Sequence, residues 1–130
     1  MKMPDDLRYT INDEWIRVQG DSAEVGISDH AQDQLSDIVY LEIHPAKGDA
    51  LKAGAPFAAV ESVKAAADVY MAVDGEILEG NDTLKEAPEK INSDPYGEAW
   101  IIKIKLADPG QVEGLMDAAA YKKHIEEREA

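Results

Sequence analysis

The stretch FAAVESVKAAADVY, residues 57–70, decides the fold. It reads as two short runs that meet at one lysine, Lys64. Residues 57–60 form a bounded apolar run typical of a buried strand, and residues 68–73 mix polar and β-favouring residues. A lysine between two such strands has to point outward, because burying an unpaired ammonium group costs several kcal/mol. The pattern therefore predicts a tight hairpin with Lys64 near its crest.

Composition predicts one small acidic domain. The 130 residues are 45% hydrophobic, which is enough for one domain with a real core. The chain carries 27 acidic and 13 basic side chains, for a formal net charge of -14. Such a surface repels phosphate backbones and anionic lipids, so it argues against nucleic-acid and membrane partners. It favours partner proteins with basic docking rims.

Several kinds of site are not expected. The chain has no cysteine, which excludes disulfides, thiol catalysis and cysteine-ligated metals. His30, His44 and His124 are scattered without companion ligands, so no metal site is predicted. Residues 28–30 read Ser-Asp-His, but adjacent residues seldom form a hydrolase triad, and no other catalytic set is present. Residues 1–6 do not resemble a secretion signal and no run is long enough to span a bilayer, so we expect a cytoplasmic protein.

The chain reads as short strands separated by turns, followed by a helical tail. Strands are predicted at residues 8–11, 15–19, 23–27, 38–43, 57–60, 68–73, 77–79 and 100–106, with a turn at 73–76. Asp29 with Gln32 resembles a capping box that opens a short helix ending at Leu35. Asn81-Asp82-Thr83 offers a second cap, for a short helix that ends at residues 87–88. Asp108 with Pro109 reads as an N-cap before a tail of about residues 108–130, most helical from 117 to 129.

Two short segments of the sequence resemble each other, and this internal echo refines the predicted fold class. Gly48-Asp49 and Gly75-Glu76 lie on either side of Lys64 and begin similar segments. This echo predicts two similar small sheets joined by the central hairpin, with the lysine at one end. The predicted class is therefore mainly β, a flattened β-barrel or sandwich with short helices and a C-terminal helix.

A set of short motifs follows one order along the chain: Glu14-Trp15, residues 25–32 (VGISDHAQ), residues 61–65 (ESVKA), Gly75-Glu76, residues 92–98 (NSDPYGE), Trp100 and Lys103-Ile104. Together these motifs resemble the H protein family of the glycine cleavage system, a family of lipoyl carriers. The resemblance implies a barrel-sandwich hybrid and a single lipoyl-carrier domain over residues 1–130. It also implies lipoate joined to Lys64 by an amide. Two departures are small: Met71-Ala72 replaces the usual Ala-Pro, and Asp13 stands where histidine is common.

The resemblance also implies a function and its partners. The chain would be a non-catalytic carrier that shuttles an aminomethyl group from a pyridoxal-phosphate glycine decarboxylase to a folate-dependent aminomethyltransferase. Dihydrolipoyl dehydrogenase would then reoxidise the lipoyl arm. A lipoate-attaching enzyme would recognise the hairpin through Glu61, Ser62, Val63 and Ala65, unless Glu61 instead caps the local backbone.

The loaded arm exposes a cationic amine, which carboxylates near the lysine would hold. The resemblance assigns this contact to Glu14, with Asp68 and Asn12 as weaker candidates. The alternative is that Glu14 and Asp68 are simply solvated. Residues 92–97 are interpreted as a shaped turn that supports the domain, with Tyr96 as an alternative docking residue.

Four other functions are compatible with parts of the pattern. Biotin carriers share the hairpin, but they usually flank the lysine with methionines, where this chain has Val63 and Ala65. Lipoyl domains of 2-oxoacid dehydrogenases are normally followed by flexible linkers. The remaining two alternatives are an H-like protein that only relays lipoate and an acidic binding domain in which Lys64 is unmodified.

Overall fold

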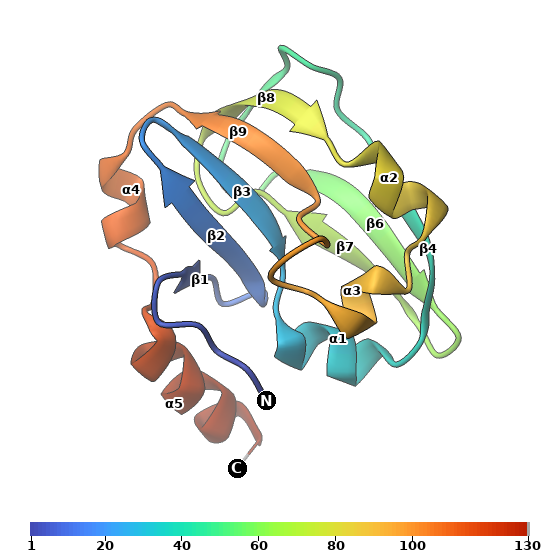
Figure 1. The fold of residues 1–130 in the computed structure, drawn as a ribbon. Helices are drawn as coiled ribbons and strands as arrows, with labels where there is room; N and C mark the ends of the chain where they lie inside the picture. Colours follow the sequence, from blue (N-terminus) through green and yellow to red (C-terminus); the bar gives the residue numbers. More distant parts are fainter. Residues whose placement is uncertain (130) are drawn as a thin grey trace.

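The computed structural model describes residues 1–129, which form two antiparallel β-sheets and five short helices (Figure 1). The strands are β1 (Arg8–Tyr9), β2 (Glu14–Gln19), β3 (Ser22–Ile27), β4 (Ile38–Ile43), β5 (Ala50–Leu51), β6 (Pro56–Ser62), β7 (Ala66–Tyr70), β8 (Gly75–Gly80) and β9 (Ile102–Leu106). The helices are α1 (Asp29–Leu35), α2 (Asp82–Glu86), α3 (Lys90–Ser93), α4 (Gly110–Glu113) and α5 (Ala118–Glu129).

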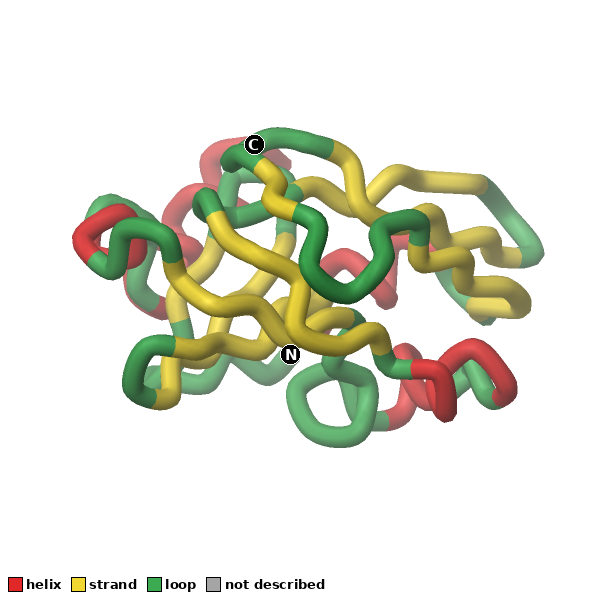
Figure 2. Tube along the Cα trace, turned by 90° about the horizontal axis from the view of Figure 1, so that it is seen from above, coloured by secondary structure: helices red, strands yellow, loops and turns green. Residues whose placement is uncertain are grey.

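The two sheets form a sandwich, which confirms the predicted mainly-β fold class. The larger sheet has the order β1-β2-β3-β9-β8-β5, and the smaller has the order β4-β6-β7. Figure 2 shows strands running through the body of the molecule, with helices at several places around them. The main apolar core contains Ile16, Val25 and Ile104 from the larger sheet with Leu41 and Val60 from the smaller one.

The expectation of two similar sheets is wrong. The segment that follows Gly48 is the two-residue strand β5, whereas Gly75 begins the six-residue strand β8. These two strands pair with each other in the larger sheet, with Ala50 opposite Glu76. The echo in the sequence therefore marks two neighbouring strands of one sheet.

Two boundaries near these strands also differ from the prediction. Gly75 and Glu76 lie within β8 and not in a turn, because both pair with β9, where Gly75 lies opposite Leu106. Strand β7 covers residues 66–70 instead of 68–73. It ends before Met71, whose backbone N–H donates to the Ala55 carbonyl.

Strand β2 is buried on both faces at its start, although the alternation of Trp15, Arg17 and Gln19 with Ile16 and Val18 predicts a half-buried strand. Ile16 belongs to the core between the sheets, while Trp15 belongs to a second apolar cluster. That cluster includes Leu7 from the N-terminal segment and Tyr121 from α5. Figure 1 shows α5 and the N-terminal segment close together below β2. The alternation fails because a segment over 100 residues away covers the second face.

Helix caps follow the sequence only in part. Ser28 caps α1, and its hydroxyl accepts from the Ala31 backbone N–H at 3.1 Å. The predicted cap, Asp29, is instead in the first turn and accepts from the Gln32 side chain. The cap at Asn81 is confirmed, because its side chain accepts from the Leu84 N–H.

The helical tail is confirmed from Ala118 to Glu129, whereas Ala130 lies outside the described residues. Pro109 is the N-cap of α4, where the sequence predicted Asp108. The Asp108 carboxylate still accepts from the Gly110 N–H at 3.1 Å.

The motif at residues 92–97 has the predicted structural role. Asn92 in α3 accepts from the Ile38 N–H and donates to the Ser36 carbonyl, which joins α3 to the start of β4. Tyr96 is buried, and its hydroxyl donates to the Lys2 carbonyl at 2.7 Å and accepts from the Asp29 N–H. Burial raises the pKa of Tyr96 to about 12. Tyr96 is therefore a packing residue and not a docking residue.

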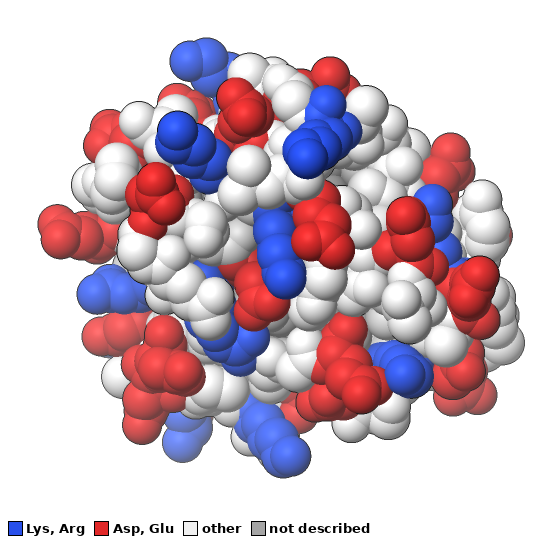
Figure 3. Space-filling model, turned by 45° about the horizontal axis from the view of Figure 1, so that its top comes forward, with Lys and Arg blue, Asp and Glu red and all other residues white. Residues whose placement is uncertain are grey.

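The larger sheet carries rows of paired charges. Arg17 on β2 lies opposite Glu24 on β3. Glu24 lies opposite Lys103 on β9. Lys103 lies opposite Glu79 on β8. The Arg17 and Glu24 side chains approach to 3.1 Å. Figure 3 shows basic side chains interspersed among acidic ones on the face that it presents. Cross-strand pairs of this kind are mildly stabilising and spread the acidic charge.

Gly26 is required by its cross-strand partner. It lies opposite Trp15, and a Cβ at Gly26 would sit 2.8 Å from three atoms of the indole ring. The ring cannot move away freely, because its Nε1 donates to the Pro95 carbonyl at 2.9 Å.

We therefore expect Gly26→Ala to lower the free energy of unfolding by about 1–3 kcal/mol, the usual cost of overpacking. Urea denaturation monitored by tryptophan fluorescence measures this change. Gly114→Ala is the matched control, because a Cβ there meets only the Gln111 carbonyl at 3.5 Å and the backbone is helical. An equal loss of stability in both variants would contradict the explanation.

Candidate functional site

The crest of the β6–β7 hairpin is closed by Ser62. Its backbone N–H donates to the Ala65 carbonyl at 2.8 Å. Its hydroxyl oxygen accepts from the N–H groups of Lys64 at 3.1 Å and Ala65 at 2.9 Å. Glu61 is exposed on the preceding strand. The local backbone cap is therefore Ser62 and not Glu61, and it fixes the main chain from which the exposed Lys64 side chain projects.

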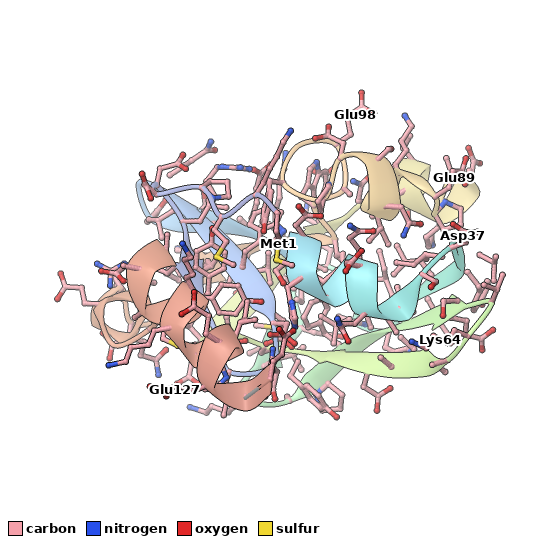
Figure 4. The ribbon with its side chains drawn as sticks, turned by 90° about the horizontal axis from the view of Figure 1, so that it is seen from below. Met1, Asp37, Lys64, Glu89, Glu98 and Glu127 are labelled. Carbon is pink, nitrogen blue, oxygen red and sulfur yellow. The ribbon has the colours of Figure 1, made fainter. Side chains whose placement is uncertain are left out.

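Lys64 lies at the predicted crest and extends towards the C-terminal end of α1 (Figure 4). Its Nζ donates to the Gln34 carbonyl oxygen at 3.4 Å. The last carbonyls of a helix have no partner within the helix and attract a cation. The turn is also attached to the α1–β4 connection, because the Val63 N–H donates to the Asp37 carbonyl at 3.0 Å.

A cavity of about 200 Å³ lies between α1 and the adjacent strands. Its polar lining includes Asn12, Glu14, Gln34 and Asp68. Its apolar wall is formed by Ile27, Ala31, Leu35, Val60, Ala67 and Val69. The structure thus brings together the three predicted contact residues, and Lys64 reaches the cavity wall through its bond to Gln34.

Glu14 is almost fully buried at the start of β2, with 1% of its surface exposed. Its carboxylate accepts from the Thr10 hydroxyl at 2.5 Å and from the Tyr70 backbone N–H at 3.2 Å. Burial raises the pKa of Glu14, and these two hydrogen bonds lower it only in part. The interpretation of Glu14 as a solvated residue is therefore wrong, whereas Asp68 and Asn12 are exposed.

The four residues predicted for recognition of the hairpin surround its crest. Val63 is 70% exposed, Glu61 and Ala65 are exposed, and Ser62 is half-buried. Sequence reasoning missed Thr10, Gln34 and Tyr70. Gln34 and Tyr70 act through backbone atoms, so their side chains gave no signal.

The histidines do not assemble into a metal site. His30 is buried on α1, His44 follows β4 and His124 lies on α5. Residues 1–129 contain no group of three or more histidine, aspartate or glutamate side chains placed to hold a metal ion. Within the same residues, no helix is both long and apolar enough to cross a membrane. The cytoplasmic location stays a prediction.

An exposed lysine at the crest of a hairpin, next to a cavity lined by a buried carboxylate, is the arrangement expected of a carrier domain. The family model for the glycine cleavage H-protein matches residues 7–128. The chain is 50% identical over 129 residues to the glycine cleavage system H protein of Anaeromyxobacter sp. (strain K), covering 99% of this chain and 100% of that one. It is 52% identical over 122 residues to that of Bacteroides thetaiotaomicron, covering 94% and 96%.

A solved structure agrees with these relatives. The crystal structure of a glycine cleavage system H protein from Mycobacterium marinum superposes with a TM-score of 0.85. It has 31% sequence identity and covers 95% of this chain and 98% of that chain. The chain belongs to the glycine cleavage H-protein family. Proteins of this family are lipoyl carriers within the glycine cleavage system and are not themselves catalytic. The alternatives of a biotin carrier and of a 2-oxoacid dehydrogenase domain are therefore not supported.

The raised pKa of Glu14 predicts a pH-dependent stability. Protonated Glu14 contributes stability in acid, and that contribution is lost as pH rises above the ordinary value of 4.5 and through the pKa in the folded protein. Glutamine at position 14 cannot ionise, so the Glu14→Gln variant does not lose this contribution to stability. The unfolding free energy of Glu14→Gln relative to the unmodified sequence should therefore increase as pH rises.

Urea denaturation between about pH 4 and pH 8 measures this difference. The exposed Glu76→Gln is the control and removes an equal charge. Parallel pH profiles for the two variants would show that burial of Glu14 does not perturb its ionisation.

Proposed function

We propose that lipoate is joined by an amide to Nζ of Lys64, and that the chain carries an aminomethyl group on it. The cargo is received from a pyridoxal-phosphate glycine decarboxylase and delivered to a folate-dependent aminomethyltransferase. Dihydrolipoyl dehydrogenase then restores the oxidised arm. One observation carries the proposal: the exposed Lys64 amine contacts Gln34, which lines the same cavity as the buried Glu14.

The residues around the cavity fit a lipoyl group. When bound, lipoate supplies the sulfur chemistry that takes up and releases the one-carbon group. Ser62 holds the backbone of the crest, so the lysine side chain moves while its origin stays fixed. Leu35, Val60 and Ala67 offer an apolar wall to an acylated lysine, which has no charge to solvate.

Glu14 is proposed to hold the cationic amine of the cargo. An ammonium group beside this carboxylate would offset the cost of burying it, since an opposite charge favours the ionised form. Thr10 and Tyr70 fix the two carboxylate oxygens by hydrogen bonds. Asp68 and Asn12, which are exposed in the same cavity, are proposed as weaker contacts.

Three enzymes and one attaching enzyme are the proposed partners. The net charge of -14 favours enzymes with basic rims around their active sites. Glu61, Ser62, Val63 and Ala65 are the residues proposed to identify the hairpin to the lipoate-attaching enzyme. Tethering raises the concentration of the cargo at each partner to about the millimolar range.

Lipoylation should occur only at Lys64. Protein purified from its own cells should show the intact mass of the lipoylated chain, and Lys64→Gln expressed in the same cells should show the bare mass. Lys52→Gln is the control, because Lys52 is an exposed lysine beside a different cavity. A bare mass for the natural protein would support the alternative of an acidic binding domain with an unmodified lysine.

Glu14→Ala should accelerate spontaneous loss of the cargo from the loaded protein by roughly tenfold, the usual value of a hydrogen bond to a charged group. Lipoylation should be unaffected. Hydrolysis releases formaldehyde and ammonia, so the appearance of either product over time measures the rate, with the exposed Glu76→Ala as control.

Unchanged release kinetics would remove Glu14 from the site.

Reconstitution with the three glycine-cleaving enzymes separates the carrier from a protein that only relays lipoate, because a relay protein would accept no cargo. The buried Glu14 favours the carrier, since lipoate relay requires no group that binds an amine.

A further inference from the structure

The loop that leads to Glu14 has an unfavourable backbone at Asp13. Asp13 has a φ of 69°, in the left-handed region that costs an ordinary residue about 1 kcal/mol. Within the loop, the Asp13 N–H donates to the Thr10 carbonyl at 3.2 Å. The Asp13 carbonyl accepts from the Ser28 N–H at 2.8 Å, which attaches the loop to the start of α1. A persistent left-handed residue requires support from its surroundings.

Helix α5 supplies that support from the other end of the sequence. The Tyr121 hydroxyl donates to Oδ1 of Asp13 at 2.9 Å, and Nη2 of Arg128 donates to the same oxygen at 2.9 Å. The Tyr121 hydroxyl is also bonded to the Ser28 hydroxyl at 2.6 Å. Its ring is fully buried and stacks on Tyr9, with centroids 4.5 Å apart. One hydroxyl thus joins α5, the loop and the N-cap of α1.

Asp13 is the residue next to the buried carboxylate of Glu14. Glu14 is the next residue in the chain, and its Oε2 crosses to the Tyr70 N–H of β7 at 3.2 Å. The next backbone N–H, that of Met71, donates to the carbonyl oxygen of Ala55. The Tyr70 N–H donates instead to a side-chain oxygen, that of Glu14. The Glu14 carboxylate therefore belongs to the residue that directly follows the one bound by α5.

We propose that Tyr121 and Arg128 are positioning residues, which act through Asp13 to hold Glu14 at the cavity and so lengthen retention of the cargo. This inference rests on the proposed function of Glu14. It assigns α5 a role beyond covering Trp15 and Tyr9, since the bonds to Asp13 involve only polar atoms at the edge of that packing.

The substitutions that test the proposal leave the apolar packing in place. Tyr121→Phe keeps the ring stacked on Tyr9 and removes only the hydroxyl. Arg128→Gln removes the charge of a partly exposed side chain, and Arg128→Lys is the conservative variant that restores it. Glu127→Gln is the matched control on α5, where Glu127 is exposed at the end of the molecule opposite Lys64 (Figure 4).

The first measurement uses the unloaded protein. Amide hydrogen exchange at Tyr70 should be roughly threefold to tenfold faster in Tyr121→Phe and Arg128→Gln, because the Glu14 acceptor is less well held. Arg128→Lys should recover most of the protection, and Glu127→Gln should show no change. Exchange at Ile104 in the central strand β9 reports global opening. An equal acceleration at Ile104 and Tyr70 would show a purely structural role and overturn the proposal.

The second measurement uses lipoylated protein loaded by the glycine decarboxylase. Loss of the cargo should be roughly threefold to tenfold faster in Tyr121→Phe and Arg128→Gln than in the unmodified sequence or Glu127→Gln. Unchanged loss in both variants would overturn the proposal. If the unmodified sequence accepts no cargo while Tyr70 exchange responds as expected, the positioning of Glu14 is supported and the proposed carrier function fails instead.

Discussion

A buried carboxylate joins the two sheets at the point where the candidate site lies. Glu14 begins β2 of the larger sheet, and its side chain binds the N–H of Tyr70 at the end of β7 in the smaller one. Taking an ionised carboxylate out of water costs several kcal/mol, and two hydrogen bonds repay only part of that cost. Proteins keep such groups where activity requires them, at some expense in stability. The raised pKa of Glu14 is the electrostatic consequence of burying this carboxylate.

The rest of the site follows from the geometry that this contact imposes. The contact fixes the Tyr70 end of β7 beside Glu14, and the opposite end of the same strand leads to the hairpin crest, where Lys64 lies against the end of α1. The hairpin crest is stiff in its main chain, where Ser62 accepts two N–H groups, and free in its lysine side chain. A carrier requires this combination, because the arm has to visit several proteins while each partner recognises one fixed surface.

The sequence predicted those features that depend on neighbouring residues. The hairpin around Lys64, the cap at Asn81 and the helix at the end of the chain each follow from local periodicity or turn chemistry. The burial of Glu14 could not be derived in this way, because it arises from packing against β7, more than 50 residues later. The burial of Trp15 could not be derived for the same reason, since Trp15 packs in one apolar cluster with residues of α5. Ser28 and Asp29 are equally good caps by residue type, and only the backbone at Ser28 decides between them.

The contact between Lys64 and α1 has a practical consequence for handling the protein. In the unmodified chain the ammonium group lies on the free carbonyl of Gln34, at the negative end of the helix. An uncharged acyl group on this amine removes that positive charge and makes the whole molecule one unit more negative. The acylated and bare forms should consequently separate on an anion-exchange column, with the acylated form retained longer, so that a mixed preparation is resolved without denaturation.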